Sequence, residues 1–209
     1  MSEGQESPAG RRLGVLVSGR GSNLQALIDA VQDDRLRATI ALVISNVPGA
    51  PALSKAAAAG IETLVVPHTG WPSREAYDEQ LVAALQARRV DVVCLAGFMR
   101  RLSTRFLDRF TGAVVNVHPS LLPAFPGVDA PAQALAHGVK VAGCTVHLVT
   151  PELDAGPIVR QSAVPVLPDD SAESLAARIL VEEHRLLPDA VACILSGRWR
   201  LDGRRFIDA

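Results

Sequence analysis

The sequence predicts a single-domain α/β fold with a doubly wound, mostly parallel sheet and helices on both faces. Short runs rich in Val, Leu and Ile alternate with longer segments rich in Ala, Leu and Arg, which is the pattern of alternating strands and helices. The runs are nearly continuous in apolar residues, as in parallel strands buried on both faces. The 209 residues are 48% hydrophobic and 21% charged with net charge -1, which fits one globular domain and excludes a disordered chain or a polyelectrolyte.

The amino-terminal half predicts five strands joined by helices. Its apolar runs are LGVLV, ATIALVI, ETLVV, DVVCLA and AVVNV, and strands favour such aliphatic residues. The segments between them have helix composition and mostly end at Gly or a polar turn. The predicted strands are residues 13–17, 38–44, 62–66, 91–96 and 113–117, and the predicted helices are 23–32, 51–59, 74–89 and 104–110.

The pattern changes after residue 117. The next ten residues, HPSLLPAFPG, hold three prolines and a glycine, so we expect a loop rather than a helix or a central strand. Ser171 offers a cap for a long last helix, and Asp202-Gly203 is a typical hairpin turn. The remaining predicted elements are helices at 130–137 and 171–195, strands at 139–149 and 157–166, and a hairpin at 199–206.

Composition also limits the class of protein. Residues 1–12 are expected to form a disordered tail before one domain at residues 13–209. No apolar run approaches the roughly 20 residues of a membrane helix, and the polar start lacks the apolar core of a signal peptide. We therefore expect a cytoplasmic protein with no membrane partner, and without excess positive charge we expect no nucleic-acid partner.

The cysteines and histidines predict no metal site. Cys94, Cys144 and Cys193 occur singly in apolar stretches, which indicates buried thiols rather than a zinc site or a disulfide framework. The five histidines lack the spacing of metal ligands. His147, inside a predicted strand, is expected to be packed and hydrogen-bonded.

The loop SGRGSN at residues 18–23 is a candidate anion site. Its glycines allow a tight turn, and the start of the following helix offers unpaired amide donors that favour a phosphate. It is not the dinucleotide pattern, because Leu24 stands where a third glycine would be, and it lacks the Lys-Ser/Thr of a P-loop. A plain strand-to-helix turn with Ser22 or Asn23 as cap is the alternative.

The stretch VNVHPSLLP at residues 115–123 is the most informative. Asn116 and His118 end the fifth predicted strand two positions apart, so their side chains share one face, at the strand ends where open α/β sheets bind ligands. An imidazole can move a proton near neutrality, and a carboxamide can donate to a developing oxyanion. These two tasks are those of acyl transfer. The alternative for His118 is an ordinary turn residue beside a proline.

Asp154, in the loop TPELDAGP at residues 150–157, is the candidate partner of His118. A carboxylate beside an imidazole favours its charged form and one tautomer. No nearby Ser or Cys has a credible activating base, which favours direct transfer to a substrate nucleophile over a covalent intermediate. The alternative for Asp154 is an ordinary residue of a Gly-Pro turn.

Taken together, these motifs resemble the phosphoribosylglycinamide formyltransferase family within the folate-dependent formyltransferases. The resemblance runs in order from about Leu13 to Phe206. It rests on the segments SGRGSNLQALIDA, ISN, SREAYD, DVVCLAGFMRRLS, VVNVHPSLLPAFPG, GCTVHLVTPELDAGPI and EEHRLLP.

The resemblance implies a formyltransferase fold and transfer of a formyl group from 10-formyltetrahydrofolate to the amine of glycinamide ribonucleotide, in purine biosynthesis. Asn116 and His118 would stabilise and protonate the tetrahedral intermediate, and Asp154 would keep His118 charged and oriented. It implies a ribonucleotide site of Gly21, Ser22, Asn23 and Glu183. It implies a folate pocket of Arg74, Met99, Arg100, Arg101, Leu102, Asn116, Thr150, Pro151, Glu152, Leu153 and Asp154.

Two features depart from the family pattern. Arg20 stands where many relatives have Asn, and a cation there either strengthens phosphate binding or faces solvent. The segment 127–134 lacks the His and Arg that relatives often carry after Phe-Pro-Gly. A role of this segment in closing over substrate is therefore in doubt.

Other functions stay open at this point. Length is expected to disfavour two sibling enzymes, because a methionyl-tRNA formyltransferase would need a further carboxyl-terminal domain and a formyltetrahydrofolate deformylase, a hydrolase, would need a domain ahead of the first strand. A catalytically silent nucleotide- or folate-binding module is the alternative from another class, since fold does not fix function. The oligomeric state is undecided, with a homodimer among the options.

Overall fold

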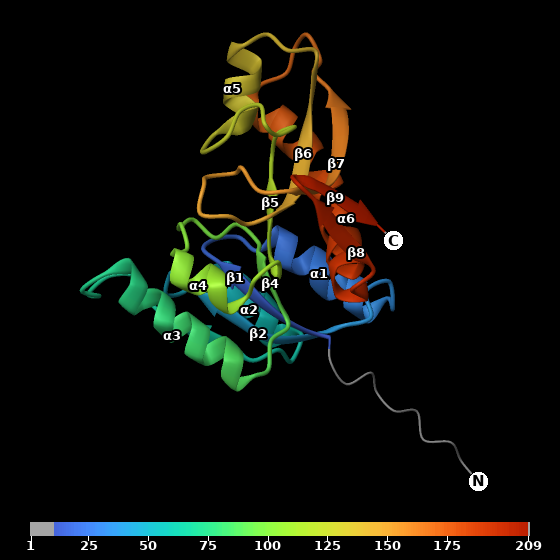
Figure 1. The fold of residues 1–209 in the computed structure, drawn as a ribbon. Coiled ribbons are helices and arrows are strands. Elements are labelled where there is room, and N and C mark those ends of the chain that lie inside the picture. Colours follow the sequence, from blue (N-terminus) through green and yellow to red (C-terminus); the bar gives the residue numbers. More distant parts are fainter. Residues whose placement is uncertain (1–10, 209) are drawn as a thin grey trace.

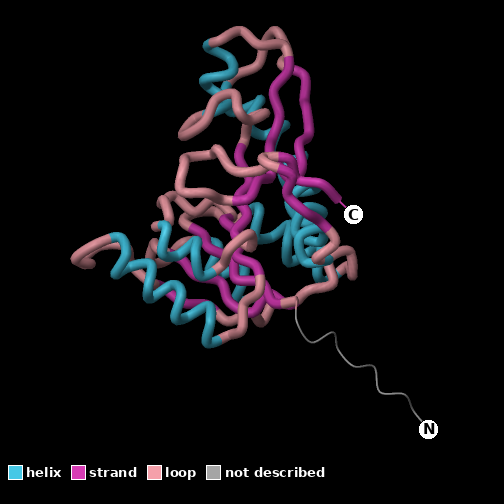
Figure 2. The backbone as a smooth tube through the Cα atoms, viewed as in Figure 1, coloured by secondary structure: helices cyan, strands magenta, loops and turns pink. Residues whose placement is uncertain are grey.

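The computed structural model describes residues 11–208 and shows an α/β fold (Figure 1, Figure 2). Of the tail predicted at residues 1–12, residues 1–10 lie outside the described range, and Arg12 already begins the first strand. The predicted elements of the amino-terminal half are all present within one or two residues of their expected bounds. They are β1 (Arg12–Val17), α1 (Ser22–Gln32), β2 (Thr39–Ser45), α2 (Pro51–Ala58), β3 (Thr63–Val65), α3 (Arg74–Ala87), β4 (Val92–Leu95), α4 (Thr104–Arg109) and β5 (Val114–His118).

The carboxyl-terminal half also follows the prediction. The proline-rich stretch after β5 is a loop, and the side chain of Ser171 caps the last helix by accepting a hydrogen bond from the Ser174 amide. The predicted hairpin is present, but its two turn residues are Gly203 and Arg204 rather than Asp202 and Gly203, because Asp202 still pairs with Arg205. The elements are α5 (Ala130–Ala136), β6 (Val141–Leu148), β7 (Ile158–Pro165), α6 (Ala172–Ser196), β8 (Trp199–Asp202) and β9 (Arg205–Asp208).

The strands form one sheet in the order β3-β2-β1-β4-β5-β6-β7-β9-β8. The strands from β3 to β5 pair in parallel, whereas β6 pairs antiparallel with both β5 and β7. The chain first runs outward from β1 to β3 and then crosses to β4 on the other side of β1. The carboxyl ends of β1 and β4 are therefore the topological switch point, where sheets of this kind bind ligands. The predicted doubly wound, mostly parallel fold is confirmed.

Alternate side chains of the parallel strands enter two separate cores. In β1, Val15 and Val17 pack with residues of α1, α2 and α6, while Leu16 packs with residues of α3 and α4. In β4, Cys94 enters the same core as Val15 and Val17, and Leu95 enters the same core as Leu16. Helices thus cover both faces of the sheet, and α3 and α4 lie together on one of them (Figure 1). This two-sided burial explains the nearly continuous apolar runs of the sequence.

The cysteines differ in burial. Cys94 and Cys144 are buried as predicted, and burial raises the pKa of each thiol to about 12. Cys193 is only partly buried, which corrects the prediction. It lies near the end of α6 at the surface, where its Sγ approaches Asp208 Oδ1 at 3.3 Å. No helix within residues 11–208 is long and apolar enough to cross a membrane.

Candidate active site

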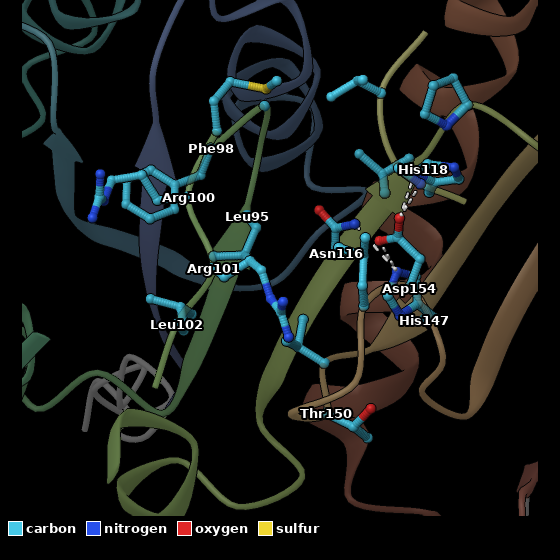
Figure 3. Close-up of a pocket in the computed structure, with 18 of the residues that line it drawn as sticks. Leu95, Phe98, Arg100, Arg101, Leu102, Asn116, His118, His147, Thr150 and Asp154 are labelled. Carbon is cyan, nitrogen blue, oxygen red and sulfur yellow. Dashed lines mark hydrogen bonds and ion pairs between the residues drawn. The ribbon is translucent and has the colours of Figure 1, made fainter. Parts of the chain in front are cut away.

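A cavity of about 500 Å³ lies at the carboxyl ends of β4 and β5. Its walls are the segment after β4, the end of β5, the loop between β6 and β7, and single residues from α1 and α6 (Figure 3). It thus gathers segments that are far apart in the sequence. The predicted site residues that line it are Asn23, Met99, Arg100, Arg101, Leu102, Asn116, His118, Thr150, Pro151, Glu152, Leu153, Asp154 and Glu183.

Asn116 and His118 reach the cavity because they share one face of β5. Val115 and Val117 of the same strand pack into the core with residues of α1 and α6, so the alternate side chains turn to the opposite face. Both edges of β5 are paired, one with β4 and the other with β6. The strand therefore holds both side chains on rigid backbone, which suits a preorganised site.

Asp154 reaches the same point from the loop between β6 and β7. A Cβ at position 156 would lie 1.7 Å from the Leu148 carbonyl oxygen, so only Gly156 lets the loop pack this closely against β6. Asp154 itself has φ 48°, a left-handed conformation that Asp adopts more readily than most residues. Its side chain is 10% exposed. The Gly-Pro turn of the sequence thus places a carboxylate beside β5.

His118 and Asp154 are both bound to the loop that follows β5. Nδ1 of His118 lies 3.5 Å from Asp154 Oδ2, and Nε2 lies 2.9 Å from the Phe125 carbonyl oxygen. Both neighbours are acceptors, so a ring protonated on both nitrogens satisfies both contacts. Oδ2 of Asp154 also accepts a hydrogen bond of 2.8 Å from the Gly127 amide. The proline-rich loop therefore fixes the orientation of the pair.

His147 belongs to the same cluster, although the sequence predicts only a packed residue. It is 2% exposed and hydrogen-bonded, as expected, but the antiparallel register of β5 and β6 places it opposite Asn116, in the cavity wall. Its Nδ1 lies 3.0 Å from the Leu148 carbonyl oxygen, and its Nε2 lies 3.2 Å from Asn116 Nδ2. Burial lowers the pKa of His147. The neutral ring donates from Nδ1 and accepts at Nε2.

The contact between Asn116 Nδ2 and His147 Nε2 assigns the orientation of the Asn116 amide. Its nitrogen donates to His147, so its second N–H is available to a ligand in the cavity. Asp154 lies between the two imidazoles, with Oδ1 3.8 Å from His147 Nε2 (Figure 3). Among residues 11–208, no group of three or more His, Cys, Asp or Glu side chains has the arrangement of a metal site.

The loop after β1 leaves the first amides of α1 without a side-chain cap. The N-cap is Gly21 at φ 72° and no side chain bonds to it, so the alternative in which Ser22 or Asn23 caps the helix is wrong. A Cβ on Gly21 would lie 2.6 Å from the Cβ of Ala52, so glycine lets the loop pack on α2. Gly21 and Ser22 do not line the main cavity, and Ser22 lines a neighbouring hollow of about 490 Å³.

Asn23 and Glu183 form a buried pair between α1 and α6. Nδ2 of Asn23 donates a hydrogen bond of 2.7 Å to Glu183 Oε2. Burial raises the pKa of Glu183, and the bond from Asn23 opposes this shift. Oδ1 of Asn23 is buried and has no hydrogen-bond partner among the described residues. The pair therefore offers unused acceptor capacity beside the cavity.

The predicted folate residues meet at the cavity except for Arg74. Arg74 is the first residue of α3 and does not line the cavity, so its role stays a prediction. The guanidinium of Arg100 lies over the ring of Tyr77, 5.4 Å from its centre. Nη2 of Arg101 donates to the Pro151 carbonyl oxygen at 3.0 Å and joins two walls of the cavity.

The rim of this cavity carries exposed apolar side chains. Met99 is 70% exposed and Leu153 is 51% exposed. Val128, which belongs to none of the predicted site residues, is 68% exposed and also lines the cavity. Water contact with large apolar groups is unfavourable, so this rim is suited to a ligand with an apolar body.

Comparison with protein families decides the class. The model of the family described as "Formyl transferase" matches residues 11–191, a span that includes every predicted site residue. The chain belongs to the formyl transferase family. The resemblance predicted from the sequence motifs is thereby confirmed. The cavity, its histidines and the buried pair of this formyl transferase all lie within the matched span.

The similarity covers most of the formyl transferase. Over 198 residues it is 42% identical to the phosphoribosylglycinamide formyltransferase of Escherichia coli (strain K12), which is 91% of this chain and 93% of that protein. The structure of glycinamide ribonucleotide transformylase 1 from Symbiobacterium toebii matches with a TM-score of 0.95 and 47% identity, covering 99% of this chain and 98% of that one.

A longer relative contains a similar unit. The formyl transferase is 51% identical over 189 residues to the trifunctional purine biosynthetic protein adenosine-3 of Drosophila melanogaster. The match covers 90% of this chain but only 14% of that relative. The chain therefore spans a small part of this relative and nearly all of the bacterial one.

Proposed function

We propose that this formyl transferase transfers the formyl group of 10-formyltetrahydrofolate to the amine of glycinamide ribonucleotide, a step of purine biosynthesis. The observation that carries the proposal is the cluster of Asn116, His118 and Asp154 at the end of an apolar-rimmed cavity. The names of relatives with similar length support the choice of substrates.

The reaction needs groups that stabilise a tetrahedral intermediate. The amine nitrogen forms a bond to the formyl carbon, and the formyl oxygen gains the negative charge. The free N–H of Asn116 and the imidazole of His118 both line the cavity in which the formyl group would lie, and such donors act strongly in a site shielded from water. Breaking the bond to the folate nitrogen, with a proton delivered to that nitrogen, then gives the formylated ribonucleotide and tetrahydrofolate.

Asp154 supports His118 in this scheme. Its carboxylate lies beside Nδ1 and favours the ring that carries a proton on both nitrogens. Nε2 is bonded to the Phe125 carbonyl in the structure, so delivery of a proton from Nε2 requires exchange of this partner. The incoming amine loses one proton in the same sequence, and His118 is the group placed to pass a proton between the two nitrogens.

The cavity has the polarity that the formyl donor requires. The exposed side chains of Met99, Val128 and Leu153 would cover the flat apolar part of the folate. The segment 99–102 and the loop 150–154 would enclose it between the walls that Arg101 joins. Placing the donor here brings its formyl group toward Asn116.

The other substrate would bind between α1 and α6. The uncapped amides of Ser22 and Asn23 at the start of α1 suit its phosphate. The carboxylate of Glu183 and the free Oδ1 of Asn23 would accept hydrogen bonds from its ribose hydroxyls. This arrangement leaves the glycinamide amine free to extend toward Asn116.

The direct test is an assay of donor consumption. The absorbance of a 10-formylfolate donor is followed with the enzyme, in the presence and absence of glycinamide ribonucleotide, and the product is identified by mass spectrometry. We expect donor consumption that depends on the ribonucleotide and yields one formylated ribonucleotide per donor. Release of formate from the donor in the absence of the ribonucleotide would indicate the hydrolase alternative. No reaction in either mixture would indicate a binding module.

Glu183→Gln is expected to weaken substrate binding and to stabilise the free protein. Gln retains an acceptor for Asn23 Nδ2 but removes a buried charge. Loss of a charge-assisted bond to the ribose predicts a rise of about 10-fold or more in KM for the ribonucleotide, measured by steady-state kinetics. At neutral pH the variant should have a higher Tm than the wild type, measured without ligand, because no carboxylate is buried.

The sign of the pH dependence follows from the raised pKa of Glu183. A folded-state pKa above the unfolded value stabilises the fold fully only below the unfolded pKa, and this contribution is lost as the pH rises through the folded pKa. The Tm difference between Glu183→Gln and wild type should therefore shrink toward pH 4.5, the ordinary value for Glu. Asp189→Asn, an exposed change on the same helix, is the control. Equal Tm values at neutral pH would contradict the prediction.

A cytoplasmic location is part of the proposal, because phosphorylated metabolites such as the ribonucleotide do not cross membranes unaided. The oligomeric state stays undecided, with a homodimer among the options, and sedimentation velocity can determine it.

A further inference from the structure

The hydroxyl of Ser18 joins the segments that follow three different strands. Ser18 comes directly after β1, and its Oγ donates a hydrogen bond of 2.6 Å to Asn46 Oδ1, in the segment after β2. The same oxygen accepts a hydrogen bond of 2.8 Å from the backbone amide of Met99, after β4. The backbone amide of Ser18 also donates to the Gly97 carbonyl at 3.1 Å. One small side chain thus ties together the strand ends at the topological switch point.

The direction of this hydroxyl is fixed by its partners. A serine hydroxyl has one proton, and Asn46 Oδ1 is an acceptor, so the oxygen lone pairs face the Met99 amide. Asn46 is 3% exposed, and its Nδ2 lies 3.2 Å from His68 Nδ1, which holds the amide in this orientation. The bond to Met99 is therefore part of a directed network whose buried member is Asn46.

The two segments that meet at Ser18 belong to different halves of the proposed site. On one side, the loop 18–21 leads into the start of α1 and is tied to α2 through a hydrogen bond of 3.2 Å from the Ala52 amide to the Gly19 carbonyl. On the other side, Met99 opens the segment 99–102, a wall of the cavity. The side chain of Met99 is 70% exposed, so its own packing holds this backbone only weakly.

We propose that Ser18 is a positioning residue that couples the ribonucleotide loop to the folate wall through the Ser18–Met99 hydrogen bond. This inference rests on the proposed function for the identity of the two ligands. An anion bound at the start of α1 orders the loop 18–21, and Ser18 passes this order to the backbone of Met99. Each ligand then binds more tightly when the other is present, because the cost of ordering the shared backbone is met once.

The test compares the wild type with Ser18→Ala, with Ser18→Thr, which keeps the hydroxyl, and with Ser54→Ala, an exposed serine of α2 outside the cavity. Titration calorimetry measures the Kd of tetrahydrofolate with and without saturating glycinamide ribonucleotide, a pair that cannot react. Amide hydrogen exchange at Met99, measured by NMR without ligand, reports the bond itself.

We expect the ribonucleotide to raise the affinity of wild type and Ser54→Ala for tetrahydrofolate about 5-fold or more. In Ser18→Ala the affinity increase caused by the ribonucleotide should fall to within about 2-fold of unity, and amide exchange at Met99 should accelerate about 10-fold or more. In Ser18→Thr the affinity increase and the slow exchange at Met99 should both be restored. An undiminished factor in Ser18→Ala would overturn the inference, as would equal affinities with and without ribonucleotide in a wild type that binds both ligands. A wild type that binds no ribonucleotide would instead overturn the proposed function.

Discussion

His118→Ala is expected to lower kcat for formyl transfer by about 100-fold or more. The substitution removes the proposed proton donor, while Asn116 and the cavity walls remain. Substrate binding uses groups elsewhere, so KM for the ribonucleotide should change little. Steady-state kinetics with both substrates varied would measure the two parameters separately.

The fold should survive this change. His118 ends a strand whose core contacts come from Val115 and Val117, so the far-ultraviolet circular dichroism spectrum should match that of the wild type. Gln86→Ala removes an exposed polar side chain near the end of α3, outside the cavity, and should retain full kcat. A rate for His118→Ala within a few-fold of wild type would remove His118 from the mechanism.

Asp154→Asn is expected to have an effect of similar size, about 100-fold or more on kcat, through a different cause. Asn has nearly the same shape, and its oxygen can still accept the bond from the Gly127 amide. It cannot stabilise a charged His118, because the carboxylate 3.5 Å from Nδ1 is gone. The loss should therefore appear in kcat rather than in the structure of the loop.

Two measurements separate the loss of the Asp154 charge from a change in the structure of the loop that Asp154 holds. The Tm of Asp154→Asn should stay close to that of the wild type, since the hydrogen bond to the loop is retained. Asp108→Asn removes an exposed carboxylate from α4 and serves as the matched control with unchanged kcat. If Asp154→Asn kept wild-type turnover, its charge would have no part in the reaction, and its role would be limited to holding the loop.

Much of the fold could be predicted because its signals are local. The two-sided burial of strands such as β1 and β4 is written in their continuous apolar runs, and the prolines after His118 mark the loop where it occurs. Asn116 and His118 could be paired from the two-residue period of a strand. The burial of Cys193 was predicted wrongly, because an apolar stretch at the end of a helix does not tell which of its side chains meets solvent.

The sequence alone could not place side chains that meet between different strands and helices. His147 meets Asn116 only because β6 pairs antiparallel with β5, a register that no local pattern encodes. Arg74, which the resemblance places in the folate pocket, is the first residue of α3 and does not line the cavity. Asn23 meets Glu183 through the packing of α1 on α6.

The sequence by itself thus determined the order of strands and helices, the class of fold and the resemblance to formyl transferases, since these depend on neighbouring residues and recognisable motifs. The tertiary structure decided which of them meet, how the Asn116 amide is turned and how Ser18 joins two loops. The physical reason is that hydrogen bonds and charges act over a few ångströms, and only the folded chain brings residues that are distant in sequence within that range.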